Sequence, residues 1–173
     1  MEPLKTYDYL TLARQQIFEW VRPLSAEQYS REFPIWRRTL GRTLTHIMIS
    51  EWYYVQRIQG RDVPPYEQWP IQEEKPPPLA ALEAAWIEQA GRTRAALSAV
   101  RDWSADLEYR VTGEDDRPEI VTVSAADIFT QLALHEVHHR AQAMNMLRHL
   151  GVPTEDLDFN TFMYKRREAL SGD

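Results

Sequence analysis

The sequence predicts an all-α protein, an up-down four-helix bundle that forms a single domain over residues 1–173. Four long segments carry apolar residues three or four positions apart, the spacing that gives a helix one apolar face. Proline and glycine are concentrated between these segments, where helices end. A chain of 173 residues is long enough to bury one core, and it has no Cys from which a disulfide framework could form.

The N-terminal part of the chain predicts two of the long helices. Apolar spacing predicts the first over residues 6–22, and Pro23 ends it because proline has no N–H for the helix ladder. In the connector that follows, Ser25 is placed to cap a short turn. The second long helix is predicted over residues 38–58 and stops at Gly60, since glycine is common just past a helix end.

A long crossover at the surface is the next predicted element. Residues 61–78 are rich in proline, which excludes a helix or an interior strand. Helical spacing resumes over residues 79–100 and predicts the third long helix. Over residues 107–123 the apolar period falls to about two, which predicts a short hairpin or extended loop before the fourth long helix.

The fourth long helix carries the candidate site. Ser124 is placed to cap its start, and Asp127 three positions later could complete a capping box. Residues 151–153, which contain glycine and proline, end this helix. A short C-terminal helix is then predicted over residues 159–170.

Two imidazoles lie in the middle of the apolar stripe of the fourth helix. Burying an unpartnered imidazole costs free energy, so an ordinary core face would not place two of them there. Two histidines four residues apart can instead hold one divalent metal ion through their neutral ring nitrogens. His135 and His139 have this spacing. The whole stripe consists of Ile128, Leu132, His135, His139, Gln142, Met146 and Leu150.

A third ligand has to come from another helix. His46 lies on the second long helix, one residue off its apolar stripe, and this helix can face the fourth within a bundle. His46, His135 and His139 are therefore the predicted metal ligands. Three imidazoles with an open coordination position are typical of a catalytic site. The spacing also allows another interpretation, in which two hydrogen-bonded histidines lie in the core and His46 lies at the surface.

Residues next to the histidine pair have simpler interpretations. His138 is rotated by about 100° from His139 on a helix, which predicts a rim or supporting position. His149 lies near the helix C-terminus, where a positive charge is favourable. Glu136 is expected to be a salt-bridged or solvated carboxylate. Arg140 is expected to form a structural ion pair, with binding of a substrate anion as the alternative.

The same stretch satisfies a second pattern. His135-Glu136-Val137-His138-His139 fits the H-E-x-x-H motif of zinc metallopeptidases, in which Glu136 would be the general base. The longer form of that motif is absent, because the following positions offer neither its Gly nor its His. A third ligand would have to be Glu155 or Glu168, both beyond the end of the helix. The peptidase is the weaker of the two interpretations.

Charge and hydropathy narrow the expected partners. The formal net charge of −6 argues against a nucleic-acid-binding surface, which needs a basic face. The chain contains no stretch of membrane-spanning length, and its N-terminus lacks the apolar run of a signal peptide. We therefore expect a cytoplasmic protein that acts on a small molecule, with neither nucleic acid nor a membrane as partner.

Two motifs resemble those of the DinB/YfiT-like metal-binding four-helix bundles. The first is His135-Glu136-Val137-His138-His139-Arg140-Ala141-Gln142, followed by the Leu-Gly-x-Pro exit at residues 150–153. The second, Thr43-Leu44-Thr45-His46-Ile47, is similar to the motif that carries the family's first metal ligand. The family often has Gly where Ala141 stands, a small-for-small change that should leave the site intact.

This resemblance implies a function as well as a fold. It implies that His46, His135 and His139 bind a divalent metal ion such as zinc, nickel or iron. It also implies a cytoplasmic homodimer that attaches a low-molecular-weight thiol to an electrophilic small molecule, as a metal-dependent thiol S-transferase does. The alternative is a non-catalytic protein that binds a metal or a small molecule on the same scaffold.

Overall fold

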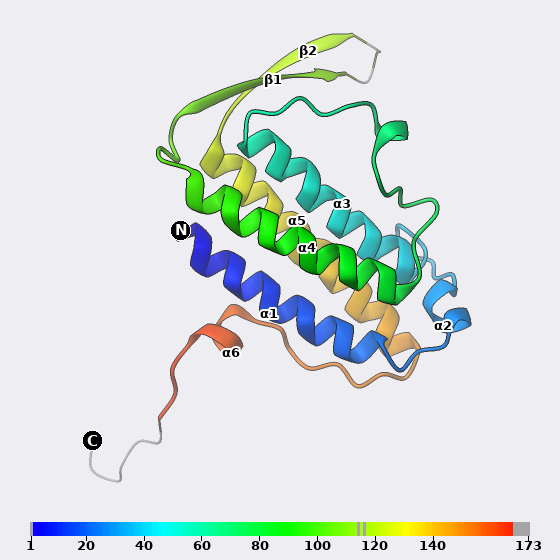
Figure 1. Ribbon diagram of the computed structural model, residues 1–173. Coiled ribbons are helices and arrows are strands. Elements are labelled where there is room, and N and C mark those ends of the chain that lie inside the picture. Colours follow the sequence, from blue (N-terminus) through cyan, green and yellow to red (C-terminus); the bar gives the residue numbers. More distant parts are fainter. Residues whose placement is uncertain (1, 114, 116, 168–173) are drawn as a thin grey trace.

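The computed structural model describes residues 2–113, 115 and 117–167, in which four long helices form a bundle (Figure 1). These helices are α1 (Pro3–Val21), α3 (Leu40–Ile58), α4 (Leu79–Ala99) and α5 (Ala125–His149). α3 packs against α4 and α5, and α1 closes the ring by packing against the same two helices. The predicted helical bundle is confirmed. None of the described helices is long and apolar enough to cross a membrane.

The directions of the four helices do not alternate along the chain. In Figure 1, α1 and α5 run towards the lower right, whereas α3 and α4 run the opposite way. The 19 residues of α3 span roughly 28 Å. An extended chain covers about 3.3 Å per residue, so the crossover at residues 59–78 is long enough to return over that distance. The up-down alternation of the prediction is therefore broken here, because α3 and α4 run parallel.

Short elements connect and extend the bundle. They are α2 (Ala26–Ser30), the 3-10 turn η1 (Tyr66–Gln68), the strands β1 (Asp106–Thr112) and β2 (Pro118–Ser124), and α6 (Phe159–Met163). η1 lies inside the crossover, so proline prevents a long helix there but not a single turn. α2 starts at the predicted Ser25 cap, which forms a capping box with Gln28.

Helix ends differ from the predictions near both termini of the chain. α1 begins at Pro3 rather than at residue 6, because proline is favoured in the first turn, where its missing N–H costs nothing. α6 ends at Met163, whereas the sequence predicts a helix to residue 170. Residues 164–167 are exposed and mostly basic, so a longer helix would bury no further apolar face. Residues 168–170 lie outside the described residues.

The predicted hairpin is observed as the antiparallel pair β1 and β2, in which Asp106 is paired with Ser124. Arg57 of α3 attaches the hairpin to the bundle, since its guanidinium lies 4.3 Å from the ring centroid of Tyr109. Ser124 also caps α5 by accepting the N–H of Asp127, as predicted. Its hydroxyl donates to the Asp127 carboxylate (2.6 Å), whereas in a capping box the backbone N–H of Ser124 would be the donor.

A buried ion-pair cluster connects the helices at the centre of the bundle. Arg14 of α1 donates to Glu51 of α3 and to Glu136 of α5, each at 2.7 Å. All three side chains are buried. Glu51 accepts three further hydrogen bonds from the surrounding helices, donated by Tyr7, Trp86 and Thr93. The cluster therefore involves side chains from all four long helices.

Removing the cation of this cluster should destabilise the fold strongly. We expect Arg14→Met to lower the free energy of unfolding by about 3–5 kcal/mol, because it leaves two buried carboxylates without their partner. Arg22→Met is the matched control, since Arg22 is an exposed residue that pairs with Glu19 and Glu83. Exposed ion pairs contribute little to stability, so Arg22→Met should lower the free energy of unfolding far less than Arg14→Met does. Urea denaturation followed by circular dichroism measures both, and equal losses would contradict the assignment.

Candidate metal centre

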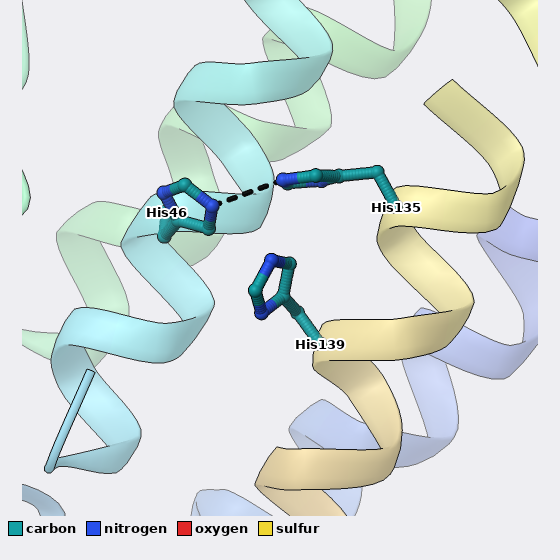
Figure 2. A group of neighbouring side chains, drawn as sticks. All are labelled: His46, His135 and His139. Carbon is teal, nitrogen blue, oxygen red and sulfur yellow. Dashed lines mark hydrogen bonds between the residues drawn. The ribbon is translucent and has the colours of Figure 1, made fainter. Parts of the chain in front are cut away.

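The structure brings together the three histidines that the sequence predicts as ligands. His46 comes from α3, and His135 and His139 come from α5, which packs against α3. One nitrogen of each ring lies within 4.8 Å of the others. Figure 2 shows the three rings turned towards one another across the space between the two helices. The Nε2 atoms of His46 and His135 are 2.9 Å apart.

The local sequence explains how this arrangement arises. His135 and His139 lie one turn apart on α5, and their ring centroids are 4.4 Å apart. His46 lies beside the buried stripe of α3, at the flank where α3 meets α5. Its ring centroid is 4.6 Å from that of His139 and 4.8 Å from that of His135. His46 therefore lies against the pair, and its side chain is 13% exposed rather than at the surface.

Hydrogen bonds to the outer ring nitrogens orient two of the histidines. The His46 Nδ1 atom lies 2.6 Å from a carboxylate oxygen of Glu73, and the His139 Nδ1 atom lies 2.8 Å from Oε1 of Gln142. Both oxygens are acceptors, so each Nδ1 carries the proton of its hydrogen bond. Partners of this kind hold metal-ligating histidines in the required orientation.

Glu73 is a functional residue that the sequence does not reveal. It lies in the proline-rich crossover, 27 positions from His46, and no periodic pattern connects the two. Its side chain is buried and ion-paired with Arg37, with Arg42 at 3.8 Å. Burial alone would raise the pKa of Glu73, but the hydrogen bond with His46 and the charge of Arg37 outweigh burial and lower it. Glu73 is therefore an anion behind the His46 ring.

His135 and His139 are neutral at physiological pH. Burial lowers the pKa of His135 to about 3, and the neighbouring histidines and Arg37 contribute to the shift. Burial lowers the pKa of His139 to about 4, against the opposing effect of the hydrogen bond to Gln142. A neutral imidazole is the form that binds a metal ion.

Other residues of the α5 motif lie outside the three-histidine cluster. His138 is exposed, and its Nε2 is 3.1 Å from the amide nitrogen of Gln142, the residue that orients His139. This agrees with the predicted supporting position. His149 is exposed at the end of α5, as expected. Arg140 is buried and donates to the hydroxyl of Tyr9, and no ion pair of Arg140 is present among the described residues, although its charge acts on the Glu136 carboxylate.

The position of Glu136 disagrees with the peptidase interpretation. A general base in an H-E-x-x-H site has to reach a water molecule on the metal. The Glu136 carboxylate is instead buried in the ion-pair cluster, where it accepts from Arg14. It is salt-bridged as expected, and the alternative of a solvated carboxylate is wrong. Glu155 is exposed and is not part of the histidine cluster, and Glu168 lies outside the described residues.

An open cavity of about 330 Å³ adjoins the cluster on the His46 side. The crossover contributes Tyr66, Trp69 and Glu73 to its lining, and Arg37 lines it from the segment before α3. Aromatic and charged side chains thus surround a space of the size that small ligands occupy.

Comparison with known proteins agrees with this geometry. The model of the DinB family matches residues 1–169. The chain belongs to the DinB family. A search of curated proteins found no similar sequence. Family membership and the three-histidine cluster together indicate binding of a divalent metal ion.

The donor set of this DinB protein fits such an ion. Zinc–nitrogen bonds of about 2.0–2.1 Å place two nitrogens on one tetrahedral ion roughly 3.4 Å apart. The three ligand atoms lie within 4.8 Å of one another, and Nε2 of His46 is 2.9 Å from Nε2 of His135, so side-chain rotations would have to even out these separations in one coordination shell. Among the described residues the cluster contains three ligands, so further coordination positions remain for an exogenous ligand.

The Glu73 carboxylate should strengthen metal binding. We expect Glu73→Gln to weaken metal affinity by about 10- to 100-fold, because the negative charge behind His46 is lost. Glu74→Gln is the matched control, since the neighbouring Glu74 is exposed and binds the Tyr66 hydroxyl instead. Competition with a chromophoric chelator measures both affinities. An unchanged affinity in Glu73→Gln would contradict this role.

The buried histidines should also make the metal-free protein sensitive to acid. The unfolded chain takes up protons near the ordinary histidine pKa of 6.5, whereas native His139 does so at about 4 and His135 at about 3. Their contribution to stability is therefore complete above about pH 6.5 and is lost as the pH falls towards 4. Urea unfolding in the presence of a chelator measures this at about pH 7.5 and about pH 5. Between these two pH values the free energy of unfolding should fall more in wild type than in the double variant His135→Leu/His139→Leu.

Proposed function

We propose that this DinB protein is a divalent-metal-dependent enzyme that transfers a low-molecular-weight thiol to an electrophilic small molecule. The observation that supports it most is the cluster of three histidines without a fourth ligand among the described residues. A structural zinc site is closed by four protein ligands, whereas a catalytic one keeps a position for substrate. Zinc, nickel and iron all accept imidazole ligands, so each is a candidate.

The residues of the proposed site have different roles. His46, His135 and His139 would hold the ion, while Glu73 and Gln142 keep the protons of His46 and His139 on Nδ1. A bound divalent ion would supply a Lewis acid that lowers the pKa of a coordinated thiol. The chain has no Cys, so the thiol has to come from a cosubstrate.

The proposed reaction is a substitution at carbon. The thiol gives its proton to solvent, its sulfur uses a lone pair to form the new S–C bond, and the leaving group departs with the electrons of the broken bond. The cavity beside His46 offers the electrophile a place near the metal ligands, with Tyr66 and Trp69 as apolar walls. The homodimer and the cytoplasmic location stay predictions.

Metal content is the first test of this proposal. Wild type should bind near-stoichiometric metal, and His46→Ala, His135→Ala and His139→Ala should each lose most of it because a ligand is missing. His138→Ala and His149→Ala remove exposed imidazoles of the same helix and should keep the metal. Elemental analysis of tag-free protein measures this, and metal that persists in the three ligand variants would overturn the site.

Thiol transfer to a chromogenic aryl halide then tests the activity. Metal-loaded wild type should catalyse transfer, and His139→Ala should lose it, while His149→Ala should keep it. Stoichiometric metal without transfer for any low-molecular-weight thiol would favour the non-catalytic binder on the same scaffold.

A further inference from the structure

The segment between α2 and α3 places Arg37 beside the metal ligands. Its Nη2 atom lies 3.3 Å from Nε2 of His46, the nitrogen that faces His135. Nη1 pairs with Glu73, and the guanidinium stacks 4.6 Å from the ring centroid of Trp36. Arg37 also lines the open cavity next to His46. The guanidinium is thus held between the metal ligands and the space where a small molecule would bind.

The backbone of this segment adopts an unusual conformation at Arg37 and at the residue after it. Arg37 has φ 71° and Arg38 has φ 62°, the left-handed region that residues other than glycine rarely occupy. Two backbone hydrogen bonds stabilise this turn. The N–H of Phe33 donates to the carbonyl of Arg38 (2.7 Å), and the N–H of Arg38 donates to the carbonyl of Ile35 (2.8 Å). Strained conformations that the surroundings enforce are concentrated at functional sites.

A bound metal would leave Arg37 in need of an acceptor. The His46 Nε2 lone pair can accept from Nη2 of Arg37 or bind a metal ion, but it cannot do both. The Nε atom of Arg37 is already buried without a hydrogen-bond partner among the described residues. Nε–H and Nη2–H form one edge of the guanidinium, and this edge matches the two oxygens of a carboxylate. With metal present, both donors of that edge would need a partner.

With a metal ion bound, local charge also favours an anion at this position. Arg37 and Arg42 bring two positive charges to the centre, and Glu73 and Glu74 bring two negative charges to the cavity beside it. These protein charges balance, so a bound divalent ion would itself make the pocket cationic, although the whole chain carries a net charge of −6. A cationic pocket on an acidic protein concentrates anionic ligands and disfavours neutral ones.

We propose that Arg37 selects thiols that carry a carboxylate, by binding the carboxylate while the sulfur takes the open metal position. This inference rests on the proposed metal-dependent thiol chemistry. Arg37 is then a specificity-determining residue for the thiol. If it only fixed the crossover through Glu73, its loss would weaken metal binding and the binding of all thiols alike.

The test compares 3-mercaptopropionate with its neutral isostere 3-mercaptopropionamide on the cobalt-loaded protein. Cobalt affinity is measured first, by chelator competition, in wild type, Arg37→Gln and Arg38→Gln. Binding of each thiol is then followed by the absorption change that sulfur ligation causes in cobalt(II) proteins. Arg38→Gln is the matched control, because Arg38 shares the left-handed backbone but points to an exposed partner, Glu32.

Wild type should bind the carboxylate thiol about tenfold or more tightly than the amide, as expected for a charge-assisted pair. Arg37→Gln should lose that preference while its affinity for cobalt and for the amide stays close to wild type. Arg38→Gln should keep the preference. Equal affinity of wild type for both thiols, a preference that survives in Arg37→Gln, or loss of cobalt binding in Arg37→Gln would each overturn the role of Arg37. Absence of any absorption change with either thiol would instead refute the proposed function, and the inference with it.

Discussion

The fold depends on the ion pairs that Arg14 forms with Glu51 and Glu136 in the middle of the bundle. Removing one partner of a buried ion pair is strongly destabilising, so this cluster favours the relative position of α1, α3 and α5 in which all its partners meet. Glu51 follows His46 by five positions on α3, and Glu136 follows His135 directly on α5. The ion pairs therefore connect the two helices that carry the histidines, α3 and α5.

Helices and loops contribute differently to the metal centre. The helices provide the three imidazoles, whose spacing depends on rigid packing between α3 and α5. The loops provide the charges, because Glu73 comes from the crossover and Arg37 from the segment before α3. The crossover makes α3 and α4 parallel and at the same time carries Glu73 to the outer face of His46. One long loop thus allows the parallel arrangement of α3 and α4 and also provides the carboxylate next to His46.

The sequence predicts best what depends on neighbouring residues. Helical spacing and end signals predict α3 over residues 38–58, and the structure gives Leu40–Ile58. The Ser25 and Ser124 caps are observed where they are predicted, because each depends on a residue three positions later. The hydrogen bond from Arg140 to Tyr9 is not predicted, because Tyr9 lies 131 positions away in the chain.

The sequence alone determined the helices, their apolar faces and the pair of histidines one turn apart, since all of these follow from local periodicity. Only the tertiary structure decided which side chains meet across the bundle. Arg14 reaches Glu136 over 122 positions, and Glu73 reaches His46 from a loop without any repeating pattern. These contacts depend on helix packing and on the path of a loop, and neither is encoded in the spacing of nearby residues.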